Sequence, residues 1–296
     1  MADVVKELEE FAEIAKAREP LAAYTFLKLG GPAELLVQPR TVAELSSVVR
    51  RCGAKQLALR VLGSGCSVLV RDEGVRGVVL RLQAAEFQQV TVQGTRVRAG
   101  SGAALSALIS AAARHGLAGL ETLVGTPGTV GGALRRNAGD RAGEIGQFVR
   151  HVEVLDAQGN AQVRERDDLR FGYRSSNLDD PVVVAGEFEL EPDSAGAIIK
   201  RMRKAWIQRK ASQPFSFQSA GRIFKNPRGL SAAALIEQAG LAGTKVGSAE
   251  VSDRDTNFIV CEPGTSARDV LRLIDLVRSR VQEQFHVELE LDISIW

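Results

Sequence analysis

The chain reads Gly125-Thr126-Pro127-Gly128-Thr129-Val130-Gly131-Gly132-Ala133, followed by Asn137-Ala138-Gly139, where its glycines are densest. The first eight of these residues contain four glycines, one proline and two threonines. Glycine permits close approach of a ligand to the backbone and dihedral angles that other residues avoid. The segment therefore predicts a rigid loop with many exposed amides, which suits a phosphate-rich cofactor better than a simple turn does.

A second glycine cluster, Gly63-Ser64-Gly65-Cys66-Ser67, directly follows the apolar run 57–62, which predicts a β-strand. Its backbone N–H groups are suited to wrapping an anionic phosphate. The cluster is neither a Walker loop nor a GxGxxG fingerprint, because the required lysine and third glycine are absent. By itself it fits a tight turn without a ligand equally well, and only the two clusters together favour a phosphate-rich cofactor.

Composition narrows the class of protein. The 296 residues are 45% hydrophobic and 25% charged, a length that predicts two or three packed units. The 38 basic and 36 acidic residues give a net charge of +2, which favours neither nucleic acid nor an anionic membrane as partner. No stretch approaches the ~18 apolar residues of a membrane span. The cysteines, Cys52, Cys66 and Cys261, lack disulfide or zinc spacing, and the three histidines are isolated, so we expect a cytoplasmic protein without a metal site.

Helices and strands are mixed without regular βαβ spacing, which favours the α+β class. The periodicity predicts helices over residues 4–16, 42–52, 104–114, 195–210, 231–239 and 267–285. It predicts strands over 57–62, 77–82, 182–190, 257–261 and 287–295, hairpins over 88–99 and 152–164, and two short strands around Gly30-Gly31-Pro32. Three units follow from this pattern: 1–85, 86–194 and 195–296.

Four motifs, in the same order along the chain, resemble the UDP-N-acetylenolpyruvoylglucosamine reductase family. Residues 125–139 resemble its flavin-binding signature and residues 63–70 its pyrophosphate loop. Phe171-Gly-Tyr-Arg-Ser-Ser and Ser219-Ala-Gly-Arg-Ile-Phe-Lys-Asn-Pro are similar to its two active-site motifs. The likeness runs from about Tyr24 to the C-terminus and is to the shorter subtype of the family.

The resemblance implies an FAD-binding fold of the vanillyl-alcohol oxidase/p-cresol methylhydroxylase type with a C-terminal α+β substrate domain. On this view residues 1–85 and 86–194 are FAD-binding subdomains, and residues 195–296 bind the substrate and supply the final strand. The implied enzyme reduces the enolpyruvyl ether of a UDP-sugar to UDP-N-acetylmuramate, a step of peptidoglycan synthesis and hence of cell-wall biogenesis, cell shape and division. NADPH reduces the flavin and leaves, and the small-molecule UDP-sugar takes its place. No nucleic acid or membrane partner is implied, and we expect a monomer.

Carried over residue by residue, the resemblance implies FAD contacts from both glycine clusters. They are Gly63, Ser64, Gly65, Cys66, Ser67, Val68, Gly125, Thr126, Gly128, Thr129, Gly132, Asn137, Gly139 and Ile145. It implies that Tyr173, Lys210 and Asn226 bind the substrate. Lys210 fits an ordinary role equally well, as a positive charge near the end of its helix.

The catalytic positions are Arg174, Arg222 and Asp292. Arg174 matches the family arginine that grips the enolate, and a guanidinium suits carboxylate geometry. Asp292 stands where the family has a glutamate in the final strand, one methylene longer. Arg222 stands where the family has its proton donor, a serine or cysteine. The arginine guanidinium has a very high pKa and stays protonated in proteins, so it is a very poor proton donor.

Arg222 leaves several interpretations open. The chain is a paralogue that has lost reductase activity, Ser219 delivers the proton from a rearranged loop, or the donor has been substituted deliberately or by sequence error. In each case we expect NADPH to bleach the flavin, because that half-reaction needs no proton donor, and the enolpyruvyl sugar to reoxidise it slowly. Arg254-Asp255-Thr256-Asn257-Phe258 also stands where the family commonly has Lys-His-Ala-Asn-Phe.

Two functions of other classes compete with the reductase. One is a catalytically inactive protein that binds FAD or a UDP-sugar, which Arg222 favours and Tyr173, Arg174 and Asn226 disfavour. The other is an FAD oxidase of the same fold acting on another alcohol, which predicts flavin held covalently by a histidine or cysteine.

Overall fold

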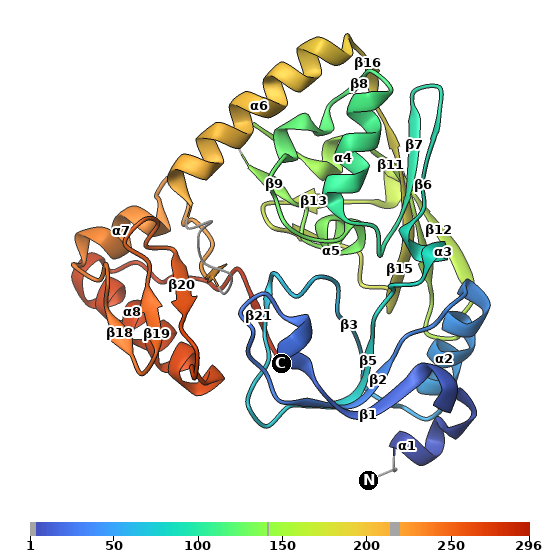
Figure 1. Cartoon of the computed structure of the whole chain (residues 1–296), viewed down its shortest axis with the longest axis horizontal. Coiled ribbons are helices and arrows are strands. Elements are labelled where there is room, and N and C mark those ends of the chain that lie inside the picture. Colours follow the sequence, from blue (N-terminus) through green and yellow to red (C-terminus); the bar gives the residue numbers. More distant parts are fainter. Residues whose placement is uncertain (1–3, 141, 214–219) are drawn as a thin grey trace. The chain divides into compact units, whose positions relative to one another are not determined.

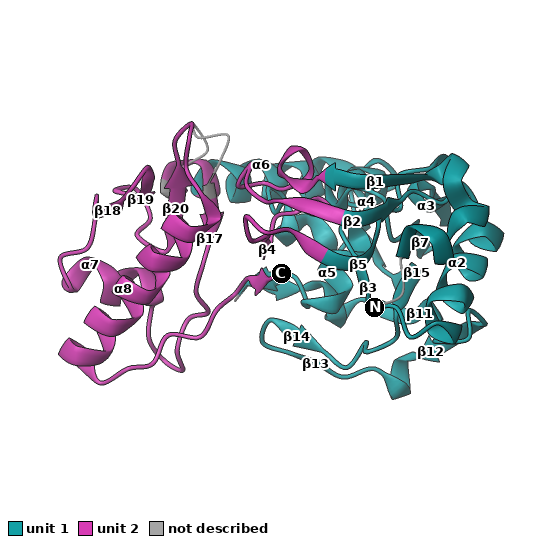
Figure 2. Ribbon diagram, turned by 90° about the horizontal axis from the view of Figure 1, so that it is seen from below, with its two compact units in different colours: residues 1–19, 34–63, 76–208 teal, residues 20–33, 64–75, 209–296 magenta. Residues whose placement is uncertain are grey.

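The computed structural model describes residues 4–140, 142–213 and 220–296 (Figure 1). The chain divides into two compact units (Figure 2). The first unit comprises residues 1–19, 34–63 and 76–208, and the second comprises residues 20–33, 64–75 and 209–296. Each unit is thus assembled from three separate stretches of chain, and the division into 1–85, 86–194 and 195–296 stays a prediction.

One half of the first unit is built on a four-stranded sheet in the order β1-β2-β5-β3. These strands are Ala15–Pro20, Pro32–Val37, Val75–Leu80 and Leu59–Val61, and β3 runs parallel to β5. Helix α2, Val42–Ala54, begins at Thr41, whose hydroxyl accepts a hydrogen bond from the Glu44 N–H. Its buried residues recur at helical spacing, Leu45, Val48, Val49 and Cys52, and join the core of this sheet. The predicted helix over 42–52 is confirmed.

The other half of the first unit is a five-stranded antiparallel sheet in the order β12-β11-β15-β7-β6. The strands are β6 Val90–Gln93, β7 Arg96–Gly100, β11 Val149–Leu155, β12 Ala161–Glu165 and β15 Val182–Glu189. Figure 1 shows α4, Leu105–Arg114, and α5, Val130–Arg135, on one side of this sheet. Leu105, Leu108, Ile109 and Ala112 of α4 are buried in its core, at the i, i+3, i+4, i+7 spacing of an amphipathic helix. Both predicted hairpins and the strand over 182–190 are confirmed.

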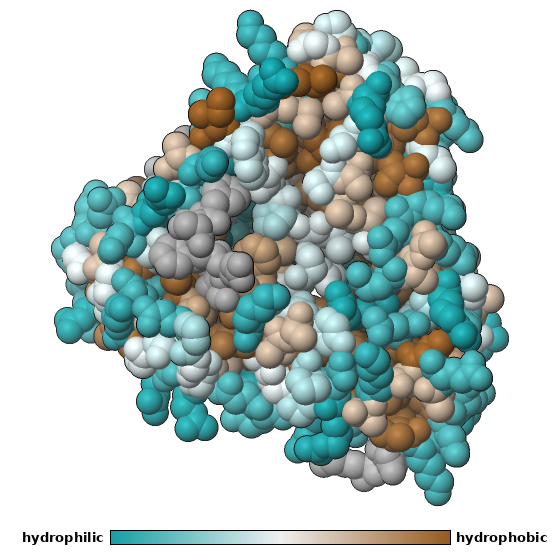
Figure 3. Space-filling model, viewed as in Figure 1, coloured by the Kyte–Doolittle hydropathy of each residue, from teal (hydrophilic) through white to brown (hydrophobic). Residues whose placement is uncertain are grey.

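Short elements connect these sheets, and the long helix α6, Ala195–Ser212, follows them in the chain. The short elements are α1 Val4–Glu7, η1 Glu9–Ile14, η2 Leu21–Tyr24, β4 Val68–Leu69, α3 Ala85–Gln88, β8 Leu117–Ala118, η3 Leu120–Leu123, β9 Gly139–Asp140, β10 Gly143–Glu144, η4 Ile145–Gln147, η5 Arg166–Asp168, β13 Phe171–Gly172, β14 Ser175–Ser176 and β16 Glu191–Pro192. Ile199, Trp206 and Ile207 of α6 are exposed, and Figure 3 shows hydrophobic surface along this helix among hydrophilic side chains.

The second unit has its own core, formed by a four-stranded sheet in the order β17-β20-β19-β18 and two helices. The strands are β17 Ala220–Arg222, β18 Lys245–Val246, β19 Ala249–Val251 and β20 Phe258–Cys261; the helices are α7 Ala232–Gln238 and α8 Ala267–Phe285. A capping box between Ser266 and Asp269 starts α8, and both carboxylate oxygens of Asp72 accept N–H groups of its first turn. At the end of the chain β21, Ser294–Ile295, pairs in parallel with β4.

Three predicted elements are wrong in part. Residues 4–14 contain α1 and the 3-10 helix η1, kinked at Phe11, and residues 15–16 already belong to β1. Residues 24–30 form no strand, because the Thr25 hydroxyl bonds the backbone of Leu29 in both directions and so competes with ladder pairing. The final segment pairs as a strand only at Ser294–Ile295, with an isolated bridge at Leu291.

Within the described residues, no helix is both long and apolar enough to cross a membrane.

Candidate functional site

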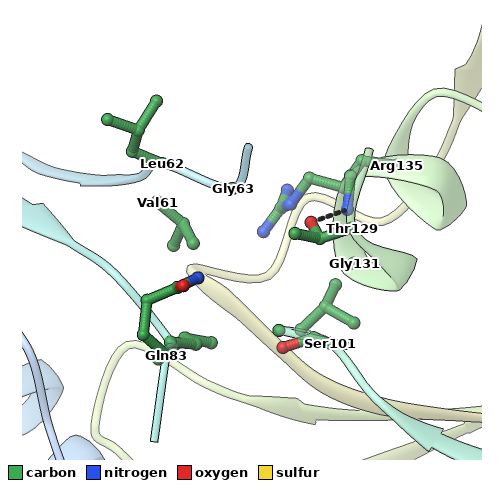
Figure 4. A pocket seen from close by; sticks show the side chains of 12 residues that line it. Val61, Leu62, Gly63, Gln83, Ser101, Thr129, Gly131 and Arg135 are labelled. Carbon is green, nitrogen blue, oxygen red and sulfur yellow. Dashed lines mark hydrogen bonds between the residues drawn. The ribbon is translucent and has the colours of Figure 1, made fainter. Parts of the chain in front are cut away.

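The first unit contains a pocket with a cavity volume of about 70 Å³ that opens to solvent, and Figure 4 shows its lining side chains. Its walls come from the end of β3, the segment after β5, the turn after β7, the start of α5, and β15. The lining residues are Val61, Leu62, Gly63, Leu82, Gln83, Ser101, Gly102, Thr129, Gly131, Gly132, Arg135 and Val183. The structure therefore brings together Gly63, Thr129 and Gly132, three of the residues predicted to contact a cofactor.

The N–H groups in the first turn of α5 are already hydrogen-bonded to acceptors within the protein. The Val130 N–H donates to Ala103 O at 2.9 Å and the Gly131 N–H to Ser101 O at 2.9 Å. The Gly132 N–H donates to Thr129 Oγ1 at 3.4 Å, the bond drawn in Figure 4. A side chain at position 131 would place its Cβ 2.8 Å from Ser101 Cβ, so this approach of α5 to the turn after β7 requires glycine.

The loop before α5 has the amides that the sequence predicts to be available. In the described structure, the N–H groups of Gly125, Gly128 and Thr129 donate to no other protein group. Gly125 and Gly128 have φ angles of +81° and +142°, a region that favours glycine. The loop itself, and not the helix behind it, therefore presents donors to a ligand.

The cluster at 63–67 has the same property. None of the N–H groups from Gly63 to Ser67 donates to a protein acceptor within the residues described. Gly65 has a φ of +70°, and Val68 begins β4 in the pairing with Ser294. Burial raises the pKa of the Cys66 thiol, whose sulfur lies 2.9 Å from Ser64 Oγ. Successive unpaired amides are typical of a phosphate-binding turn, and Cys66 is a small residue within it.

Two buried hydroxyls test whether this site suits a flavin nucleotide. Ser101 Oγ and Thr126 Oγ1 are buried without a hydrogen-bond partner in the described structure. A buried polar atom left unpaired costs about 1–3 kcal/mol, so native proteins rarely keep one without a ligand or water. Apolar walls from Leu62, Leu82 and Val183 suit a planar ring, and the free amides suit phosphates. The residues present therefore fit FAD.

Arg135 lines the pocket although the sequence did not single it out. Its guanidinium donates to the carbonyls of Leu178 at 2.5 Å and Pro181 at 3.2 Å, and also to that of Asp180. Burial lowers the pKa of this group. Its donors are thus used to hold the chain after residue 176 against α5, and its role is to shape the wall.

Asn137 is the centre of a buried hydrogen-bond network. It is 1% exposed and has a positive φ of +45°. Its amide nitrogen donates to Glu144 Oε2 at 2.7 Å and to Gly172 O at 3.0 Å, while its oxygen accepts the Gly146 N–H at 3.0 Å. Gly139 pairs with Glu144 across the β9–β10 hairpin, and Ile145 is fully buried beside it. Asn137 thereby ties the glycine-rich segment to the hairpin formed by β13 and β14.

That hairpin carries Tyr173 and Arg174 as its two-residue turn, since Gly172 pairs with Ser175. Arg174 has a φ of +55°, an unusual value for a residue with a side chain. Ser176 Oγ anchors the hairpin to Arg135 O at 2.9 Å. The Arg174 guanidinium lies 5.8 Å from the centre of the Tyr173 ring, and Tyr173 is 49% exposed. A strained arginine held at the tip of a doubly anchored turn is typical of a functional position.

In the second unit, Arg222 ends β17 and pairs with Phe258 of β20. The Asp292 N–H donates to Ile223 O at 2.7 Å, and Phe224 bridges to Leu291. The structure thus places Arg222 and Asp292 within one residue of each other along paired segments. Ser219, the alternative donor, lies outside the described residues.

The remaining predicted substrate residues are Asn226 and Lys210. Asn226 Oδ1 accepts the Ala232 N–H at 3.1 Å, so this side chain supports the start of α7. Lys210 is exposed near the C-terminal end of α6, where its positive charge interacts favourably with the helix dipole. Substrate binding by either residue stays a prediction.

Sequence reasoning missed Gln83, Ser101 and Arg135 as lining residues. Ser101-Gly102 carried a usable signal, because small residues directly before a predicted helix permit close approach of a ligand. No local sequence pattern marks Gln83 or Arg135 as a lining residue, because only the packing of β5 and α5 brings them to the pocket.

Comparison with known proteins agrees with this geometry. Residues 33–163 match the FAD binding domain family. The structure of Phl p 4.0202, a glucose dehydrogenase, shares the fold with a TM-score of 0.50 and 18% identity, covering 64% of this chain and 44% of that one. The protein is a flavoprotein oxidoreductase with the FAD-binding fold of the vanillyl-alcohol oxidase/p-cresol methylhydroxylase type, and the predicted fold class, cofactor FAD and enzyme class are confirmed.

Its closer relatives define the family. Residues 213–296 match the UDP-N-acetylenolpyruvoylglucosamine reductase, C-terminal domain. The chain is 42% identical over 280 residues to UDP-N-acetylenolpyruvoylglucosamine reductase 2 of Symbiobacterium thermophilum, covering 94% of this chain and 91% of that relative. The crystal structure of UDP-N-acetylenolpyruvylglucosamine reductase from Thermus caldophilus superimposes with a TM-score of 0.82 and 39% identity over 95% of this chain and 98% of that one. The chain belongs to the UDP-N-acetylenolpyruvoylglucosamine reductase family.

Proposed function

We propose that the chain reduces UDP-N-acetylglucosamine enolpyruvate to UDP-N-acetylmuramate with NADPH as electron donor, in the cytoplasm and as a monomer. The observation that carries this proposal is the turn of Tyr173 and Arg174, held by Asn137 and Ser176 directly beyond the glycine-rich segment. An FAD oxidase of alcohols has no need for a cation fixed in this way, whereas reduction of an enolpyruvyl ether builds negative charge beside a carboxylate.

When bound, FAD supplies the redox chemistry, taking two electrons from NADPH and passing a hydride to the enolpyruvyl group. Arg174 stabilises the resulting negative charge from the tip of the anchored hairpin. The N–H groups of 63–67 and those of Gly125, Gly128 and Thr129 bind phosphates, and the hydroxyls of Ser101 and Thr126 complete their hydrogen bonds with the nucleotide. Val68 closes the first loop by pairing in β4. Asp292 assists the protonation, and Tyr173, Lys210 and Asn226 hold the UDP-sugar.

A second candidate function is that of an inactive paralogue that binds FAD or a UDP-sugar. Arg222 favours it, because a guanidinium in the position of the proton donor cannot give a proton to a carbanion at neutral pH.

Anaerobic stopped-flow absorbance separates the two functions. The purified holoprotein is mixed first with NADPH and then with the enolpyruvyl sugar nucleotide. We expect NADPH to bleach the flavin and the sugar to restore its colour slowly, and Arg222→Ser to speed the second step. Failure of the sugar to restore colour in both proteins would establish the inactive paralogue, and failure of NADPH to bleach the flavin would overturn the electron donor.

A further inference from the structure

Asp255 lies beside Arg222 in the second unit, in the turn between β19 and β20. Arg222 pairs with Phe258, whose N–H donates to Asp255 O at 2.9 Å. Both residues depart from the family pattern given by the sequence, a serine or cysteine at 222 and a histidine at 255. The fold therefore brings two separate departures to the same place.

The turn holds the Asp255 carboxyl in one orientation. Oδ1 accepts the Asn257 N–H at 3.0 Å, and the Ser252 hydroxyl accepts the N–H groups of Arg254 and Asp255 at 3.2 and 3.5 Å. Asn257 is in turn fixed by two hydrogen bonds between its amide and the backbone of Phe224, at 2.9 and 2.8 Å. With Oδ1 engaged by an N–H, Oδ2 is the oxygen left to hold a proton.

The charges around this carboxyl act in opposite directions. Burial raises the pKa of Asp255, while the Asn257 N–H and the positive charge of Arg222 lower it. Asp253 and Arg254 of the same turn are exposed. Helix α7 packs on the turn through the bond from Thr256 Oγ1 to Ala233 O at 2.6 Å, and its Glu237 is exposed. Among the described residues, Arg222 is thus the charged side chain that acts on Asp255.

We propose that Asp255 supplies the proton which a serine or cysteine at position 222 would otherwise supply, and that Arg222 stabilises the carboxylate left behind. This inference rests on the proposed reductase function. The O–H bond at Asp255 Oδ2 breaks and a C–H bond forms at the substrate carbon next to the one that receives the hydride. The electron pair of the broken bond stays on Oδ2 beside the Arg222 guanidinium, and solvent returns the proton before the next turnover.

The test is a double-mutant cycle on the holoprotein with Asp255→Asn and Arg222→Ser. Asparagine keeps an oxygen to accept the Asn257 N–H but has no acidic proton. We expect Asp255→Asn to slow reoxidation by the enolpyruvyl sugar by about 10²-fold, the usual contribution of a positioned acid. In the Arg222→Ser background the same change has little effect, because serine then supplies the proton. Asp253→Asn, an exposed neighbour, is the matched control and leaves both proteins unchanged.

A second readout does not depend on turnover. The pKa of the Asp255 carboxyl, followed by carbon-13 NMR and assigned with Asp255→Asn, rises in Arg222→Ser because the nearby cation is gone. In the parent, the reoxidation rate falls as pH rises through this pKa.

The outcomes are distinct. An Asp255→Asn variant that reoxidises as fast as the parent, or one that is equally impaired in both backgrounds, overturns the inference and leaves the reductase function intact. Reoxidation of Arg222→Ser with none in the parent overturns it as well. Bleaching by NADPH without reoxidation in any variant defeats the proposed function, and the inference with it.

Discussion

The flavin pocket of the first unit and the Arg222 turn of the second unit are built from different kinds of groups. The pocket is lined by the Ser101 hydroxyl and the backbone of the glycine-rich segment, and the Arg135 guanidinium in its wall is hydrogen-bonded to backbone carbonyls. Thr126, with a second unpaired hydroxyl, lies in the loop before α5. The turn brings Asp255 close enough to Arg222 for the positive charge of the arginine to lower the pKa of the carboxyl, and both residues are half-buried. The first region follows the family pattern closely, and the second departs from it twice.

This difference shows which part of the protein is free to change. Backbone amides are present whatever the side chains are, so a cofactor loop depends mainly on the glycines that allow its conformation. Proton transfer depends on the pKa of a single side chain, so one substitution alters it. Flavin binding and proton supply are therefore separable in this protein, and the predictions below test that separation.

The largest effect is expected at Arg174. Replacing it with glycine removes the cation and also relieves the left-handed conformation, which costs about 1–2 kcal/mol for a residue with a Cβ. Arg174→Gly should therefore raise the melting temperature while slowing reoxidation by the enolpyruvyl sugar about 10²–10³-fold. Arg174→Ala is the control, since it loses the same activity without the gain in stability. Thermal unfolding and stopped-flow absorbance measure the two effects, and normal reoxidation in either variant contradicts the role of the cation.

A smaller loss is expected when the network around Asn137 is broken. Asn137→Ala leaves the Gly146 N–H and the Gly172 carbonyl without their partner and should cost about 2–3 kcal/mol of unfolding free energy. It should also raise KM for the sugar more than it changes bleaching by NADPH, because the hairpin of Tyr173 and Arg174 loses its anchor. Urea unfolding and steady-state kinetics provide the measurement. Asn177→Ala, at an exposed asparagine of the same region, should change both far less.

The two unpaired hydroxyls, Ser101 and Thr126, should affect FAD binding and not folding. Ser101→Ala removes a buried hydroxyl that has no protein partner, so the protein without FAD should be at least as stable as before. FAD affinity should fall about fivefold, the value of one neutral hydrogen bond of about 1 kcal/mol. Flavin fluorescence during titration of the stripped protein measures this change, and Ser106→Ala on the exposed side of α4 is the control. Unchanged affinity in both Ser101→Ala and Thr126→Val would show that the nucleotide does not reach these hydroxyls.

The smallest effect compares two carboxyls whose pKa values move in opposite directions. Arg98 lowers the pKa of Glu153 through bonds of 2.6 and 2.7 Å, whereas burial raises the pKa of Asp255. The Glu153 carboxylate therefore stabilises the folded protein at pH values above its pKa in the unfolded chain. This stabilisation is lost as the pH falls through the lower pKa that Glu153 has in the folded protein. The Asp255 carboxyl stabilises the folded protein fully only at pH values below its pKa in the unfolded chain. This stabilisation is lost as the pH rises through the higher pKa that Asp255 has in the folded protein.

The two isosteric variants should thus differ in sign at pH 7. Glu153→Gln should lower the unfolding free energy and Asp255→Asn should raise it, each by no more than about 1 kcal/mol because both sites are partly solvated. Both differences should shrink as the pH approaches the carboxyl range. Urea unfolding at several pH values measures them, and two variants of the same sign at neutral pH contradict the assigned environments.

The sequence by itself determined the cofactor, the family and most of the regular elements. It did so because these depend on local properties: glycine clusters at 63–67 and 125–139, helical spacing in 42–52 and 267–285, and alternation in 152–164. It failed where a side chain competed with the ladder, as at Thr25, and where the end of a predicted helix, residues 15–16, belongs to a strand.

Only the tertiary structure decided how the remaining residues work. Contact of Asn137 with the flavin stays a prediction, and the structure adds that its amide holds the hairpin of Arg174, through a partner 35 positions away in the chain. Ser101 and Arg135 reach the pocket because β7 and α5 pack together, which no local pattern encodes. Asp255 gained its significance in the same way: a carboxyl is charged or protonated according to its burial and its neighbours, and both are set by the fold.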